Sequence, residues 1–168
     1  MIRIRKTFIV IAWLLAIVLI YMGIKGLYNR RYNPNQSIEG TVLKSGAVEI
    51  ILKPNDQHAY VVSGWINDHP VVFLVDTGAS KVTLSEKLAN RLHLTKENRL
   101  YATTANGRVL AYSTTIKSIK LGKITLRNIR AVINPGMHDN VALLGMNALQ
   151  RLSFHQSGKL LIIRQNPS

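Results

Sequence analysis

The sequence predicts a small all-β domain, a closed barrel or a sandwich, preceded by one apolar helix. From residue 38 onward, six or more short segments alternate apolar and polar residues at intervals of roughly ten residues, as all-β folds do. Turn residues separate these segments, and only residues 85–92 and 147–152 have helical character. Because 168 residues less a leader suffice for one ordinary domain, we expect a single globular unit over residues 38–168.

The apolar leader at residues 8–24 predicts a transmembrane anchor. It carries no charge, and as a helix it would reach about 25 Å, near the lower limit for crossing a bilayer. A buried core helix would have a polar face, and this segment has none. A cleaved signal peptide is the better alternative, but the residues that follow are basic and lack a small-x-small cleavage site. We therefore expect an uncleaved anchor after a basic flank at residues 1–7.

The charges beside the anchor do not settle its orientation, because three basic residues lie on each side: Arg3, Arg5 and Lys6 before it, and Lys25, Arg30 and Arg31 after it. The free amino terminus slightly favours a cytoplasmic start. The rest of the chain would then lie on the periplasmic or extracytoplasmic side of the inner (cell) membrane. Residues 25–37 end in a polar stretch with a Pro flanked by Asn and are predicted to form a linker.

The net charge of +14 raises nucleic acid as a partner, but the distribution of the charge argues against it. Residues 32–168 hold sixteen basic and eight acidic residues, so this part carries about +8, without an Arg-rich run. The nearest approach to a basic patch lies on strand-like sequence that points to more than one side: Lys117, Lys120, Lys123, Arg127 and Arg130. A solvated face near anionic lipid accounts for it better, and we expect no nucleic-acid partner.

The inventory of metal-binding side chains predicts no metal and no cofactor. The chain has no Cys, which excludes disulfides, thiolate metal sites and cysteine nucleophiles. Its five His residues are scattered, with no pair at helical or turn spacing.

The β segments are predicted to pair across short turns along the chain: residues 39–44 with 47–53, 59–66 with 71–75, 100–104 with 109–116, and 118–121 with 125–133. Asn106 and Gly107 are the strongest hairpin signal, because both central positions of a type I′ turn need positive φ. Ser85 can cap the predicted helix that it begins.

One carboxylate stands out, because Asp76 ends the apolar run VVFLV and is followed at once by turn residues. Burying an unpaired carboxylate costs stability unless something offsets it. Thr77 offers a hydroxyl and an amide, Gly78 lets the backbone turn without a Cβ, and Ser80 adds a second hydroxyl. Such a loop holds one acid in a fixed orientation. An ordinary Asp-Thr-Gly turn at the end of a strand, with no catalytic role, would have the same sequence.

The motif DTGAS, which is Asp76, Thr77, Gly78, Ala79 and Ser80, resembles the active-site signature of retroviral-type (retropepsin-like) aspartic proteases. A second motif resembles the family's apolar pair, glycine and short helix: Leu143, Leu144, Gly145 and Asn147. Between the motifs, a hairpin lies where the family has its flap, with Thr104, Ala105, Asn106 and Gly107 at its tip. Residues 151–164 resemble the closing strands of bacterial membrane-anchored members of clan AA. The resemblance covers about residues 38–164.

The resemblance implies a closed acid-protease barrel and an aspartic endopeptidase in which two carboxylates activate a water. The chain contains one DTG motif, and its other Asp residues lie in polar, turn-like contexts, so the pair would require Asp76 from each of two copies. It also implies a peptide or protein substrate, a bracing role for Thr77 between the two loops, and a flap that excludes water. One departure is Met146, where retroviral enzymes commonly carry an Arg that forms an ion pair.

Two other functions remain open at this stage. A catalytically silent, membrane-anchored β-barrel could bind peptides or partner proteins in the same cleft, although pure binding has little need for a buried acid. A module that binds lipid or nucleic acid rests on charge alone. The chain could also cut itself near residues 27–32.

Overall fold

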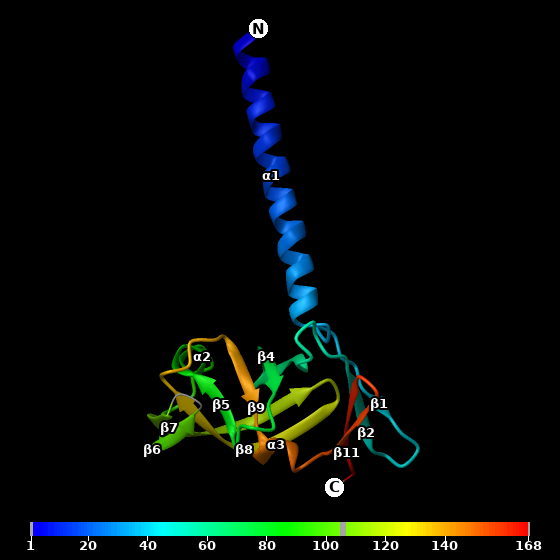
Figure 1. Ribbon diagram of the computed structural model, residues 1–168, viewed down its shortest axis with the longest axis vertical. Coiled ribbons are helices and arrows are strands. Elements are labelled where there is room, and N and C mark those ends of the chain that lie inside the picture. The colour runs from blue at the N-terminus through cyan, green and yellow to red at the C-terminus, as the bar shows by residue number, and fades with distance from the viewer. Residues whose placement is uncertain (1, 105–106, 168) are drawn as a thin grey trace. The chain divides into compact units, whose positions relative to one another are not determined.

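The computed structural model of this protein describes residues 2–104 and 107–167. The chain divides into two compact units, Met1–Tyr32 and Asn33–Ser168. The first unit is a single helix, α1 (Ile2–Tyr32), and the second consists mainly of strands (Figure 1). The strand content confirms the predicted all-β class.

Helix α1 is long enough and apolar enough to cross a membrane over Ile11–Tyr32, the one such helix in the part of the chain that was described. Arg30 and Arg31 lie in its last turn, where positive charge complements the helix dipole. The helix stops just before Asn33, because Pro34 disfavours helical backbone at the residue that precedes it. Residues 25–32, which the sequence assigns to a linker, are therefore helical.

The second half of the predicted linker is built into the β domain by two buried asparagines. The side chain of Asn35 accepts from Lys53 N (2.8 Å) and donates to Val61 O (2.7 Å). The Asn33 amide donates to Ser63 Oγ at 2.9 Å. These bonds satisfy polar groups that would be costly to bury alone, so the domain begins at Asn33 rather than at residue 38.

The larger sheet has seven strands in the order β3-β4-β9-β5-β8-β7-β6. Their bounds are β3 (Val61–Ile66), β4 (His69–Val75), β5 (Val82–Ser85), β6 (Arg99–Thr104), β7 (Gly107–Leu121), β8 (Ile124–Asn134) and β9 (Val141–Leu144). A further pairing of β3 with β7, through Trp65 with Lys120 and Ile66 with Ile119, closes the sheet on itself. The predicted closed barrel is thus confirmed.

The smaller sheet has four strands in the order β1-β2-β11-β10. They are β1 (Thr41–Val42), β2 (Val48–Leu52), β10 (Ser153–Ser157) and β11 (Leu160–Gln165). Antiparallel pairing of β1 with β2 confirms the first predicted hairpin. Ile50, Leu52, Leu161 and Ile163 of this sheet join one hydrophobic core with the larger sheet, whose largest fully buried side chains include Phe73, Leu84 and Ile116.

Two short helices complete the domain, α2 (Glu86–Arg91) and α3 (Met146–Leu149). Ser85 caps α2 as predicted, and its hydroxyl accepts from Leu88 N at 3.2 Å. Both helices bury apolar residues in the same core: Leu88 and Ala89 from α2, and Ala148 and Leu149 from α3.

Two parallel pairings in the larger sheet could not be read from local sequence. Strand β4 runs parallel to β9, with Val75 opposite Leu144, and β5 runs parallel to β8. Strand β5 also meets β9 where Thr83 lies opposite Leu143. Since β4 and β9 end side by side, the residues that follow them, Asp76 and Gly145, start from the same edge.

The predicted strands over residues 109–116 and 118–121 are one continuous strand, β7. The alternation of burial breaks at residues 117–118 and, on the partner strand, at residues 127–128, where Asn128 has φ of 52°. Pairing continues on both sides, with Ile116 opposite Ile129 and Ser118 opposite Arg127. The register is the same on both sides, so the phase of burial shifts in both strands at Lys117 and Asn128 without an inserted residue, and this shift looked like a strand boundary in the sequence.

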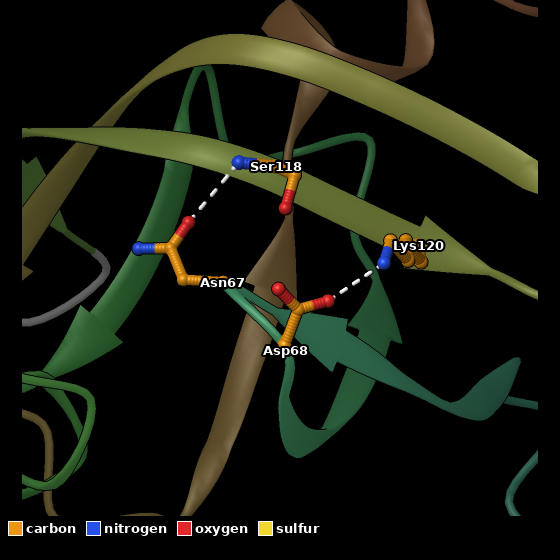
Figure 2. Close-up of polar contacts among 4 residues, drawn as sticks. All are labelled: Asn67, Asp68, Ser118 and Lys120. Atoms are coloured by element: carbon orange, nitrogen blue, oxygen red, sulfur yellow. Dashed lines mark hydrogen bonds and ion pairs between the residues drawn. The ribbon is translucent and has the colours of Figure 1, made fainter.

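The turn between β3 and β4 is tied to β7. Its central residues, Asn67 and Asp68, both have positive φ, and His69 already belongs to β4. Figure 2 shows Asn67 accepting from Ser118 N at 3.1 Å and Asp68 paired with Lys120 at 2.6 Å. The hydrogen bond and the charge of Lys120 lower the pKa of Asp68 from its ordinary value.

Candidate functional site

Asp76 directly follows β4 and is half-buried. Its Oδ1 accepts a hydrogen bond from the backbone N–H of Gly78 at 2.9 Å. Its own N–H donates to Leu144 O at 3.2 Å, and its carbonyl accepts from Ala79 N at 3.3 Å. The carboxylate is therefore oriented by a turn made of its own loop, which is itself bonded to the end of β9.

The donor to this carboxylate in the single chain is the Gly78 amide, rather than the Thr77 or Ser80 groups that the sequence suggests. Neither hydroxyl bonds Asp76 in the described structure, and both side chains are exposed. A Cβ on Gly78 would lie 3.2 Å from Asp76 Oδ1, so a larger residue here would push the carboxylate by a few tenths of an ångström. The loop thus presents Thr77 and Gly78 outward, where a second molecule could reach them.

The second predicted motif lies directly beneath the Asp76 loop. A Cβ on Gly145 would come within 2.4 Å of Lys81 O and 2.7 Å of Ala79 O, so this position requires glycine for close backbone approach. Met146 N donates to Ala79 O at 2.8 Å, and Asn147 N donates to Ser80 O at 3.1 Å. The first turn of α3 therefore holds the carbonyl groups on the far side of the loop.

Asn147 joins three segments through its side chain. Its Oδ1 accepts from Val82 N at 2.9 Å, and its Nδ2 donates to Arg130 O at 2.7 Å. Helix α3, β5 and β8 are thereby fixed together. The motif pointed to Asn147, but only the fold shows that Val82 and Arg130 contribute the backbone groups that it holds.

The apolar pair of the second motif packs beside the loop. Leu144 is fully buried, and Leu143 is half-buried opposite Leu74 of β4. Met146 packs against the hydrophobic core, so the position where retroviral enzymes commonly carry an Arg is apolar here. Thr83, which the sequence did not mark, lies opposite Leu143 and donates from its hydroxyl to Lys81 O at 3.0 Å.

The predicted flap is the hairpin of β6 and β7, which pair antiparallel up to Thr104 opposite Gly107. Ala105 and Asn106 lie outside the described residues. Gly107 belongs to β7, with φ of 103°. One face of the hairpin is open, with Tyr101 (68% exposed) directly opposite Leu110 (43% exposed) and the Arg108 guanidinium 5.2 Å from the Tyr101 ring.

The site of a single chain is open rather than enclosed. Two surface hollows have volumes of about 630 and 290 Å³, and Asp76 lines neither. Both lie along the β3–β4 hairpin and share Ser63, Gly64 and Pro70. Among the described residues, no group of three or more His, Asp or Glu side chains is placed to hold a metal ion. A single chain therefore provides one oriented carboxylate, Asp76, on a loop that is hydrogen-bonded to α3.

Comparison with known families gives one match that spans more than half of the chain. The model described as "gag-polyprotein putative aspartyl protease" matches residues 62–151, a range that contains both motifs. Among solved structures, a retropepsin-like aspartic protease from Rickettsia conorii matches with a TM-score of 0.58 and 27% identity, over 77% of this chain and 95% of that one.

Two curated proteins are also similar. An uncharacterized protein of Rickettsia prowazekii is 34% identical over 118 residues, and an uncharacterized protein of Sinorhizobium is 31% identical over 114 residues. These matches cover 68% and 66% of this chain. The chain spans about half the length of either relative, 49% in both cases.

Proposed function

Because this chain belongs to the gag-polyprotein aspartyl protease family of retropepsin-like enzymes, we propose that it is an aspartic endopeptidase whose catalytic residue is Asp76. The observation that carries the proposal is the geometry of one carboxylate, oriented by the Gly78 amide and held on a loop that Gly145 and Asn147 brace from below.

Hydrolysis by this chemistry requires a pair of carboxylates, and the chain supplies one DTG motif. We infer that the two Asp76 residues of a dimer, one from each copy, lie side by side across a two-fold axis. The dimer is then isologous. Thr77 and Gly78 are exposed at the tip of the loop, which suits an approach of two such loops. Activity should then depend on protein concentration.

In the dimer, two like charges so close together cannot both remain ionised, and the pair shares one proton. The ionised Asp76 takes a proton from a water, whose oxygen attacks the peptide carbonyl carbon. The protonated Asp76 of the second copy donates to the carbonyl oxygen. Collapse of the resulting gem-diol, with a proton passed to the amide nitrogen, breaks the C–N bond and releases an acid and an amine.

Two further elements of the proposal concern substrate access and location. The β6–β7 hairpin would act as the flap over a peptide or protein substrate. Helix α1 would anchor the chain in the inner (cell) membrane with the protease domain on the periplasmic side. Confinement to a membrane raises the effective concentration of protomers, which favours dimers without adding contacts.

The test compares the full-length chain in detergent micelles with the Asp76→Asn variant. Each is incubated with a proteome-derived peptide mixture from acidic to neutral pH, and the products are read by mass spectrometry. We expect cleavage by the wild type alone, rising more steeply than linearly with protein concentration. Equal cleavage by the variant, or none by the wild type in micelles and in vesicles, would favour the silent peptide-binding barrel instead.

A further inference from the structure

The hollow of about 630 Å³ is formed by three segments of the β domain: residues 36–39, the β3–β4 hairpin, and the turn between β7 and β8. Two glycines let these segments approach closely. A Cβ on Gly122 would lie 2.8 Å from Ile38 O, and a Cβ on Gly64 would lie 2.4 Å from Lys120 O. The volume of the hollow is in the range of pockets that hold small ligands.

The side chains that line this hollow include an aromatic ring and one charge of each sign. Trp65 is 47% exposed and lies opposite Pro70 of β4. Glu39 and Lys123 are both exposed, and in the described part of the chain neither forms an ion pair. The hollow therefore offers an apolar surface, an anion and a cation to a single ligand.

The structure separates the basic residues that lie close together in the sequence of β7 and β8. Lys120 is paired with Asp68 (Figure 2), whereas Lys123 lines the hollow. The other three line neither hollow: Lys117, Arg127 and Arg130. A polyanion such as nucleic acid is bound by several cations acting together. One cation beside one anion suits a small ligand that carries both charges.

The hollow is joined to the end of α1 by a short segment that is fixed to the β domain. Gln36, which lines the hollow, follows Tyr32 by four residues, a distance of at most about 14 Å along the chain. Asn33 and Asn35 are buried, and their side chains donate hydrogen bonds to β3. If α1 spans a bilayer, the hollow is therefore held close to the phospholipid headgroups.

We propose that this hollow binds the headgroup of a zwitterionic phospholipid in the membrane that α1 anchors. The proposal rests on the anchoring part of the proposed function and does not require peptidase activity. Lys123 would pair with the phosphate and Glu39 with the ammonium group. The ring of Trp65 suits the membrane interface, because it has an apolar body and a polar N–H. Docking would hold the β domain in one orientation on the membrane.

Fluorescence of Trp65 tests whether the hollow meets the headgroups. Trp13 and Trp65 are the two tryptophans of the chain, so the full-length Trp13→Phe variant reports on Trp65 alone. The variant is reconstituted in phosphatidylcholine vesicles with a trace of a phospholipid that carries a quenching nitroxide on its headgroup. We expect most of the Trp65 emission to be lost. The matched control is Trp13→Phe/Trp65→Phe/Tyr101→Trp, whose one tryptophan lies on the exposed face of the β6–β7 hairpin and should be quenched far less.

Charge variants in the Trp13→Phe background test which groups bind. Lys123→Glu should lose most of the quenching, because the phosphate then meets two carboxylates. Lys117→Glu makes the same change of charge at an exposed position of β7 that lines neither hollow, and it should keep the quenching. Glu39→Gln should reduce quenching on phosphatidylcholine vesicles but not on phosphatidylglycerol vesicles, which lack an ammonium group. An equal effect on both lipids would overturn the role of Glu39.

The remaining outcomes separate the docking site from the anchor and from the protease. Equal losses in Lys123→Glu and Lys117→Glu, or equal quenching of Trp65 and of the tryptophan at position 101, would overturn the site. The domain would then be held by its overall positive charge. A chain that floats with the vesicles without quenching of Trp65 would overturn the docking and leave the anchor standing, whereas a chain that does not float would overturn both. A docked chain without peptidase activity would overturn the proposed protease and leave the docking standing.

Discussion

Two hairpins of the barrel, β3–β4 and β6–β7, both pair through strand β7, yet they are held very differently. Strand β3 pairs with β4 and with β7, β4 also pairs with β9, and the turn between β3 and β4 is bonded to Ser118 and Lys120 (Figure 2). Strand β6 pairs with β7 alone, and Tyr101 and Leu110 leave one face of that hairpin open. The hairpin that delivers Asp76 is braced from several sides, whereas the proposed flap has mainly local contacts and so can move.

The largest effect should come from the carboxylate itself. Asp76→Asn should abolish peptide cleavage, because the dyad loses the group that ionises. An Asn oxygen can still accept from Gly78 N, so the free energy of unfolding should change by less than about 0.5 kcal/mol. The measurement pairs a peptidase assay with urea denaturation. A variant that loses both activity and stability would show that Asp76 is a structural residue.

The two regions should respond differently to added methyl groups. Gly145→Ala drives a Cβ against the carbonyls of Lys81 and Ala79 and should cost about 3 kcal/mol of unfolding free energy. Gly107→Ala in the β6–β7 hairpin meets no atom within 4 Å, and its φ of 103° should cost about 1 kcal/mol. If thermal or urea unfolding shows equal losses of unfolding free energy for the two variants, the two regions do not differ in how tightly they are packed.

Removing the Asn147 side chain should lower the free energy of unfolding by less than adding a methyl group at Gly145. Asn147→Ala leaves Val82 N and Arg130 O without their partner and should lower the free energy of unfolding by about 2 kcal/mol. Gln150→Ala, at an exposed position just after α3, is the control and should stay within about 0.5 kcal/mol. If the two variants unfold alike, the bonds of Asn147 do not hold the loop.

On the exposed face of the β6–β7 hairpin, Tyr101→Ser should change the free energy of unfolding by less than about 0.5 kcal/mol, because the side chain is exposed. If this hairpin closes over substrate, the variant should raise KM for peptides several-fold. A large loss of stability with unchanged KM would mean that the Arg108–Tyr101 contact is structural.

The smallest effect concerns the tie at the β3–β4 turn. Lys120 lowers the pKa of Asp68, so the stability that this pair contributes is present above the unfolded pKa of 3.8 and is lost as the pH falls through the lower folded value. Lys120→Met should therefore be slightly less stable than wild type at neutral pH and equal to it in strong acid. Both groups are exposed, so the difference should be small. Lys123→Met, with no carboxylate partner in the described chain, should show no such pH dependence.

Local sequence was sufficient for the elements with a strong periodic or turn signal. The alternating segments, the Ser85 cap and the pairing of β3 with β4 follow from side-chain spacing and turn chemistry within a few neighbouring residues. The same reasoning missed β5 and β9, which have four residues each, and divided β7 where the phase of its burial shifts. Four residues are too few to show a period, and the burial phase of β7 reverses at Lys117 without ending the strand.

The sequence by itself determined the class of fold, the apolar helix and the residue on which the chemistry was expected to rest. An acid after an apolar strand, followed by Thr and Gly, is a local pattern, and so is Gly145 before a short helix. Only the tertiary structure brought these patterns together. Parallel pairing of β4 with β9 joins residues about 70 positions apart in the sequence, and such contacts depend on the closure of the whole barrel rather than on any local preference. For the same reason, only the fold shows that Gly78 N orients the carboxylate and that Asn147 ties Val82 to Arg130.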